Sequence, residues 1–114
     1  MNRLIICVGS LLLVSTISKG DEYYSGTKLY ELCNDQTTAG LCVFYIRGFM
    51  EGMVWGSELV KARRSYCPPS NVSVTQGRLV VEKYIREHPS ELNKAAGVLA
   101  GKALALAFPC PPSN

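Results

Sequence analysis

The chain has 114 residues, of which 47% are hydrophobic and 18% charged, and its formal net charge is +3. Two of its 12 basic residues lie in a leader-like segment, residues 1–20, so 10 basic residues face 9 acidic ones in the remainder and the balance there falls to +1. A nearly neutral chain of this length predicts one small domain and lacks the charge footprint of a nucleic-acid-binding protein.

Residues 1–20 are typical of a cleavable signal peptide. A positive residue precedes an apolar stretch from Leu4 to Ile17, and Ser18 and Gly20 put small side chains at the −3 and −1 positions of a cleavage site. The alternative is a membrane helix, but the apolar stretch is shorter than the ~20 residues that span a bilayer. The sequence therefore predicts export to the periplasm, with residues 21–114 as the mature domain, which is expected to have no membrane contact.

The cysteine pattern fits an exported protein. Cys7 belongs to the leader, which leaves Cys33, Cys42, Cys67 and Cys110. An even set in a short exported chain favours two disulfides. Metal binding is the rival interpretation, but the chain has no Cys-x-x-Cys pair and a single histidine. Three pairings are possible; we favour Cys33–Cys42 as a local bridge and Cys67–Cys110 as a long-range one.

Hydrophobic periodicity predicts an all-α protein, a single small bundle of four to five helices. Ser25 is expected to cap a first short helix with Leu29, Leu32 and Cys33 on its apolar face. Residues 34–38 are polar and predict a turn, after which a long helix should run from residue 39 to residue 64.

Three glycines, Gly48, Gly52 and Gly56, recur every four residues along this long helix. Glycine costs up to ~1 kcal/mol in a helix interior, so their register predicts that another helix approaches closely there. The alternative is coincidence in a glycine-rich chain.

The second half of the chain predicts a loop and two further helices. Prolines make residues 66–71 a loop, and a Ser73–Gln76 capping box opens a helix that ends near Glu87. Its expected buried face is Leu79, Val80, Tyr84 and Ile85. A last helix is expected to begin at Pro89 and end at Phe108. Its apolar stripe is Leu92, Ala96, Leu99, Ala103, Leu104 and Ala107.

Catalytic chemistry is not expected. The only histidine, His88, lies between an acidic residue and a proline at a helix junction, where a cap or a surface position is the better interpretation. Without it no nucleophile–base set can be assembled, and the cysteines are assigned to bridges. We therefore predict neither an enzyme nor a cofactor or metal site.

A binding role is the remaining expectation, and one segment favours it. Arginines, a tyrosine and a proline-stiffened backbone are features that protein interfaces favour. The candidate partner-binding residues are Arg63, Arg64, Ser65, Tyr66, Pro68, Pro69, Ser70 and Asn71. The alternative is an ordinary basic helix end followed by a turn.

An ordered set of short motifs covers the mature chain. It comprises Leu32-Cys33, Gly40-Leu41-Cys42, Tyr45-Ile46-x-Gly48, Cys67-Pro68-Pro69, Val74-Thr75-x-Gly77, Tyr84-Ile85, His88-Pro89 and Ala107-Phe108-Pro109-Cys110. This order resembles the Rap/Tai family of periplasmic immunity proteins of type VI secretion systems. One departure is that Gln76 precedes Gly77, where the glycine is expected first.

The resemblance implies a small helical, disulfide-bonded protein that is often a homodimer. It also implies a partner: a cell-wall amidase toxin delivered by sibling cells, whose catalytic cleft such proteins block, typically with a loop between helices. In this chain the corresponding loop is Arg63–Asn71. The alternative is a free-standing envelope protein of the same fold with a structural, chaperone-like or ligand-binding role.

Overall fold

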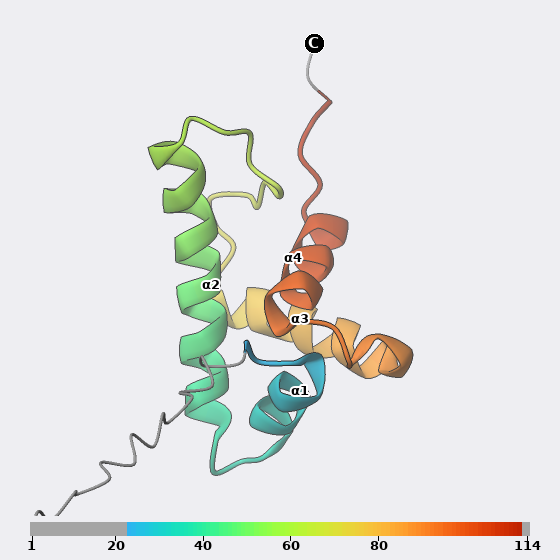
Figure 1. Ribbon diagram of the computed structural model, residues 1–114. Coiled ribbons are helices and arrows are strands. Elements are labelled where there is room, and N and C mark those ends of the chain that lie inside the picture. Colours follow the sequence, from blue (N-terminus) through green and yellow to red (C-terminus); the bar gives the residue numbers. More distant parts are fainter. Residues whose placement is uncertain (1–22, 113–114) are drawn as a thin grey trace, which may run out of the picture.

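A computed structural model describes residues 23–112, so the predicted leader lies outside the described residues. The described part contains four α-helices and a short 3-10 helix (Figure 1). They are α1 (Gly26–Asn34), α2 (Ala39–Leu59), α3 (Val74–Glu87), η1 (Pro89–Glu91) and α4 (Ala96–Ala107). The all-α prediction is confirmed. None of the described helices is long and apolar enough to span a membrane.

The core lies where α1, α3 and α4 pack against one side of the long helix α2 (Figure 1). The largest side chains that it buries completely are aliphatic, and each stabilises the fold by roughly 1.5–3 kcal/mol. They are Leu29, Ile46, Val81, Ile85, Leu99 and Leu104. On the predicted apolar face of the first helix, Leu29 and Leu32 are buried and Cys33 is half-buried.

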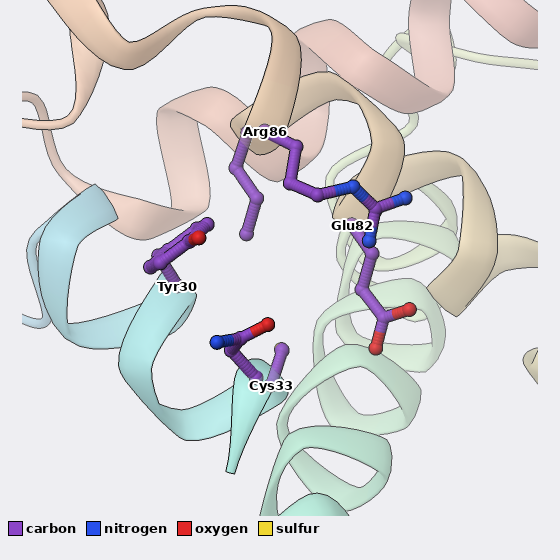
Figure 2. A pocket seen from close by; sticks show the side chains of 6 residues that line it. Tyr30, Cys33, Glu82 and Arg86 are labelled. Atoms are coloured by element: carbon purple, nitrogen blue, oxygen red, sulfur yellow. The ribbon is translucent and has the colours of Figure 1, made fainter.

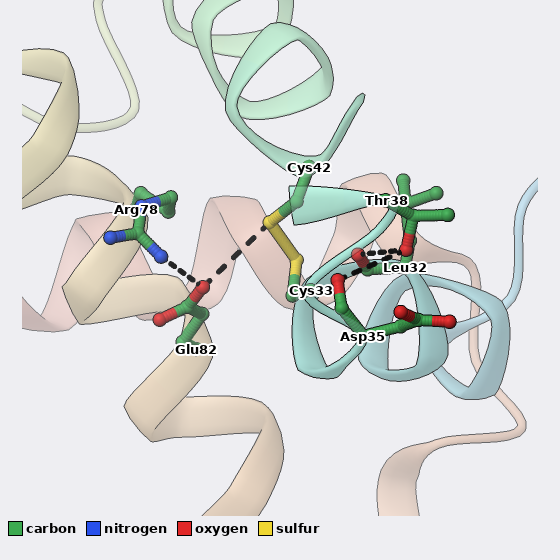
Figure 3. Close-up of a disulfide and its surroundings, with 7 residues drawn as sticks. All are labelled: Leu32, Cys33, Asp35, Thr38, Cys42, Arg78 and Glu82. Atoms are coloured by element: carbon green, nitrogen blue, oxygen red, sulfur yellow. Dashed lines mark hydrogen bonds and ion pairs between the residues drawn. A yellow bond between two sulfur atoms is a disulfide. The ribbon is translucent and has the colours of Figure 1, made fainter. Parts of the chain in front are cut away.

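Both favoured disulfide pairings are present. Cys33–Cys42 joins the end of α1 to the start of α2 with a Cα–Cα distance of 4.9 Å (Figure 3). Cys67–Cys110 joins the α2–α3 loop to the C-terminal segment with a Cα–Cα distance of 4.7 Å.

Backbone hydrogen bonds connect the start of α1 to the segment before α4. Ser25 caps α1 by accepting a bond from the Lys28 N–H, as predicted. The Gly26 N–H donates to the Lys94 carbonyl at 2.7 Å. A Cβ on Gly26 would lie 2.9 Å from both Cα and O of Leu92, so the two backbones approach closely enough to require glycine here.

Helix α2 ends at Leu59, five residues before the predicted end at residue 64. The Lys61 N–H donates to the Glu58 carbonyl and the Ala62 N–H to the Ser57 carbonyl, which is a Schellman motif. Lys61 adopts φ = 53° at the position where glycine is usual. Without that glycine the sequence carried no stop signal.

The expected helix contact at Gly48, Gly52 and Gly56 is wrong. Among residues 23–112, a Cβ at any of the three would have no neighbour within 4 Å apart from the backbone of α2 itself. The close helix–helix approach lies instead at Gly77 of α3, whose Cβ would overlap the Met50 side chain of α2. This contact could not be predicted, because Gly77 is an isolated glycine and does not belong to a periodic set along its helix.

The buried faces of α3 and α4 are partly as predicted. On α3 the face is centred on Gly77, Val81 and Ile85, while Leu79 is exposed. Helix α4 begins at Ala96 rather than Pro89, because Ala95 is extended and pairs with the segment before α1. The four predicted core positions Ala96, Leu99, Ala103 and Leu104 are buried, Ala107 is exposed, and the buried Ala100 was not predicted.

Candidate partner-binding surface

The segment proposed from sequence lies in the loop between α2 and α3. Figure 1 shows this loop at the same end of the molecule as the C-terminal segment after α4. The Cys67–Cys110 bridge joins the two segments, and the Cys67 N–H donates to the Phe108 carbonyl at 2.8 Å. The Arg63 guanidinium donates to the Pro111 carbonyl at 2.9 Å. The loop is therefore held in place at several points along its length.

Tyr66 does not form part of the exposed surface, which corrects its expected role as an interface anchor. Only 3% of the residue is exposed, and its hydroxyl donates to the Met50 carbonyl of α2 at 3.2 Å. Burial raises the pKa of this phenol above its usual value. The side chain anchors the loop to the core, because its apolar ring is buried while its hydroxyl is satisfied.

The other candidate residues lie at or near the surface. Arg64 pairs with Glu58 of α2 at 2.8 Å, an exposed ion pair of small energetic value that orients the guanidinium. Pro69 to Asn71 are exposed in a turn that the Val72 N–H closes by donating to the Pro69 carbonyl at 3.1 Å. Arg63 and Ser65 are also exposed, and Pro68 is half-buried.

A shallow groove separates this loop from α2. Its volume is about 200 Å³, and its lining includes Gly52 and Gly56 on the helix side and Ala62, Arg63 and Ser65 on the loop side. The groove could offer a partner the positive charge of Arg63 and the accessible backbone at Gly52 and Gly56.

A second hollow was not predicted from the sequence. It is open, has a volume of about 900 Å³, and is lined by Tyr23, Tyr24, Tyr45, Phe49, Ala95, Gly97 and Val98. The Tyr24 and Tyr45 rings stack with their centroids 5.9 Å apart. Burial, followed by the proximity of Tyr24, raises the pKa of Tyr45. The sequence signal was the Tyr45–Phe49 pair, one helical turn apart, together with the two tyrosines before α1.

A small pocket lies beside the local disulfide, between α1 and α3. Figure 2 shows Tyr30, Cys33, Glu82 and Arg86 around it. Its volume of about 10 Å³ corresponds to a single water molecule.

Glu82 borders both this pocket and the disulfide. Its Oε1 lies 3.8 Å from the Cys42 sulfur, and the carboxylate forms an ion pair with Arg78 (Figure 3). Cys33, Cys42 and Glu82 form a group with metal-ligand spacing. The two sulfurs are bonded to each other, so in this state the group offers a single carboxylate ligand.

His88 has a structural position, as predicted. It caps the C-terminus of α3 through its backbone N–H, which donates to the Tyr84 carbonyl. Its ring stacks on that of Tyr84 with a centroid distance of 4.0 Å, and Nδ1 lies 2.8 Å from the Tyr84 carbonyl. These contacts account for the histidine as a helix cap.

The fold and this surface define a small helical domain with two disulfides that presents a firmly held loop. A family model described as Rap1a immunity proteins matches residues 25–110, which is most of the chain. The chain therefore belongs to the Rap1a immunity protein family, and the family resemblance noted in the sequence is confirmed. Comparison with curated proteins and with solved structures gave no match. The family assigns an immunity role, which consists of binding a protein effector.

Proposed function

We propose that this immunity protein acts in the periplasm, where it binds and blocks a peptidoglycan amidase delivered by type VI secretion. The observation that carries the proposal is the family match over residues 25–110. The leader-like residues 1–20 support export, and two disulfides suit an oxidising compartment. A cell-wall amidase acts in that same compartment.

The α2–α3 loop is the element proposed to contact the toxin. The contacts of Tyr66, Cys67 and Arg63 already restrict it in the free protein. A restricted loop loses less conformational entropy on binding, so more of its contact energy contributes to affinity. Its exposed turn, Pro69 to Asn71, is the part proposed to enter the catalytic cleft and exclude substrate.

Co-expression with the toxin tests the proposal. We expect the chain to prevent lysis by a periplasmic amidase encoded beside it, and expect Arg64→Glu and Ser70→Trp to abolish protection without unfolding the domain. Lys83→Glu is the matched control, because Lys83 is an exposed cation on α3, away from the loop. Equal lysis with and without the chain contradicts the proposal. Equal protection by all three variants contradicts the assignment of the loop.

The aromatic hollow supports a second candidate, an envelope protein that binds an apolar ligand. Its tyrosines and Phe49 offer flat apolar surfaces with a polar edge, as ligand pockets do. Val98→Trp would partly fill this hollow. If this variant still protects against the toxin, the hollow has no part in immunity; if it loses a ligand that native mass spectrometry finds on the wild-type protein, the second candidate holds.

A further inference from the structure

Three side chains that can ligate a metal ion come together beside the local disulfide, one from each of α1, α2 and α3. They are Cys33, Cys42 and Glu82, whose sulfur and carboxylate oxygen atoms all lie within 4.8 Å of one another. Cys42 is completely buried and Glu82 is 9% exposed, and Figure 3 shows the carboxylate directed at the Cys42 sulfur. Because a metal ion binds thiolates, this group becomes a set of three ligands once the disulfide is reduced.

A dithiol reductant opens this bridge in two exchange steps. One thiolate of the reductant attacks the sulfur of Cys33, which is the more accessible of the two cysteines, and Cys42 leaves and takes up a proton. The second thiolate of the reductant then attacks the mixed disulfide, so Cys33 leaves as a thiol and the reductant becomes a disulfide. Two electrons and two protons thus pass from the dithiol to the two cysteines.

The fold holds the two thiols close together without the bond. Their Cα atoms are 4.9 Å apart, at the end of α1 and the start of α2. The Thr38 hydroxyl donates to the Leu32 carbonyl at 2.9 Å, which connects the two helices beside the cysteines (Figure 3). Leu29 of α1 and Ile46 of α2 are completely buried in the same core. These contacts do not depend on the disulfide, so we expect the ligands to stay within reach of one ion.

The distances fit a tetrahedral zinc ion. Zinc binds sulfur at about 2.3 Å and carboxylate oxygen at about 2.0 Å, so one sulfur and one oxygen on the same tetrahedral ion lie ~3.5 Å apart. The Cys42 Sγ and the Glu82 Oε1 are 3.8 Å apart. The pocket of about 10 Å³ next to Cys33 and Glu82 has room for one water, which would be the fourth ligand (Figure 2). Thiolate ligands also favour Zn²⁺ over Mg²⁺ and Ca²⁺, which prefer oxygen.

The charges of the site balance around such an ion. Two thiolates and one carboxylate bring three negative charges, and Zn²⁺ cancels two of them. Arg78 forms an ion pair with Glu82, so it supplies the third positive charge and orients the ligating carboxylate. We propose that reduction of the Cys33–Cys42 disulfide creates a Zn²⁺ site formed by Cys33, Cys42, Glu82 and one water. The ion then links α1, α2 and α3 in place of the covalent bond.

Zinc titration of the reduced protein tests this proposal. The reductant is a phosphine, which takes up the oxygen of one water as it reduces the bridge, and it is used because a dithiol would itself bind zinc. Without oxygen present, we expect one Zn²⁺ per chain by mass spectrometry, with release of about two protons at neutral pH. Zn²⁺ should protect Cys33 and Cys42 from iodoacetamide and leave Cys67 and Cys110 reactive. In the oxidised protein, Zn²⁺ should not bind at this site and should not change the melting temperature.

Glu82→Gln tests whether the carboxylate is a ligand. It should weaken Zn²⁺ binding to the reduced protein at least about tenfold. Glu87→Gln removes an exposed carboxylate from the same helix, so it is the matched control and should bind Zn²⁺ like the wild type. Equal Zn²⁺ affinity in the two variants overturns the proposal. Protection of all four cysteines to the same extent, or of none, overturns it as well.

Cys33→His tests the same site with the Cys67–Cys110 bridge closed and no reductant present, so it remains decisive if full reduction unfolds the chain. Imidazole is a zinc ligand, so this variant should bind Zn²⁺ at least about tenfold more tightly than Cys33→Ala does. Equal affinity in these two variants contradicts the geometry of the site. Protection against a toxin enters none of these outcomes, so they do not depend on the proposed function.

Discussion

The long-range disulfide is predicted to be the larger of two covalent contributions to stability. Cys67 and Cys110 are 43 residues apart, whereas Cys33 and Cys42 are 9 apart. In the chain-entropy treatment, closing these loops stabilises the fold by ~4 and ~2.7 kcal/mol respectively. A domain of this size has roughly 5–13 kcal/mol in total. Replacing Cys67 and Cys110 together by alanine should therefore remove a large share of the free energy of unfolding.

Urea denaturation followed by circular dichroism measures this effect. The double alanine variant at Cys67 and Cys110 should lose ~4 kcal/mol, and the matching variant at Cys33 and Cys42 should lose ~1 kcal/mol less. Cys42 is fully buried, so its replacement adds a small packing cost that narrows the difference. If removing Cys33–Cys42 lowers the free energy of unfolding by over 2 kcal/mol more than removing Cys67–Cys110 does, loop-closure entropy does not explain how these bridges stabilise the fold.

Three further predictions concern single positions. Gly26→Ala should destabilise the protein by several kcal/mol in thermal unfolding, because the added Cβ meets the backbone of Leu92. Gly77→Ala should cost less, because its Cβ meets the flexible end of the Met50 side chain. Equal losses of stability in the two variants would contradict this reasoning. Lys61→Gly should stabilise the fold by ~1 kcal/mol, since lysine occupies a left-handed conformation, and a lower melting temperature would refute that explanation. The hydrogen bond from Lys102, together with the one from Lys94, lowers the pKa of Glu91 in the folded protein. The ionised carboxylate therefore stabilises the fold above the pKa of about 4.5 that Glu91 has in the unfolded chain, and this stabilisation is lost as the pH falls through the lower pKa of the folded state. Glu91→Gln should therefore reduce the loss of melting temperature between pH 6 and pH 3, and an unchanged loss would exclude this ion pair as a source.

Much of the fold could be predicted because its signals are local. The Ser73–Gln76 capping box, the polar turn before α2 and the prolines of the loop each act within a few residues. The even cysteine count predicted two disulfides but left three pairings possible, and the favoured pairing is the one that the structure contains. The end of α2 at Leu59 could not be predicted, because the left-handed residue after it is Lys61 and not the usual glycine. The turn is closed by hydrogen bonds from the Lys61 and Ala62 N–H groups to the Glu58 and Ser57 carbonyls.

The site was predicted less well because exposure is a property of the whole fold. The sequence predicts Tyr66 as an interface anchor, but its side chain is buried and its hydroxyl donates to the Met50 carbonyl, next to the Cys67–Cys110 bridge. The glycines of α2 predicted a close helix contact, and that prediction is wrong, because the described chain supplies no helix on that face. A periodic run of glycines identifies a helix face without large side chains, and it does not say what lies against that face.

Titration of the purified chain into a purified amidase, encoded beside it and assayed by release of peptide from peptidoglycan, tests the central claim most directly. We predict that activity falls to background when one chain is present per amidase molecule. We also predict that Arg64→Glu and Ser70→Trp inhibit only at large excess, whereas Lys83→Glu inhibits like the wild type. Undiminished amidase activity in the presence of excess chain would contradict the account.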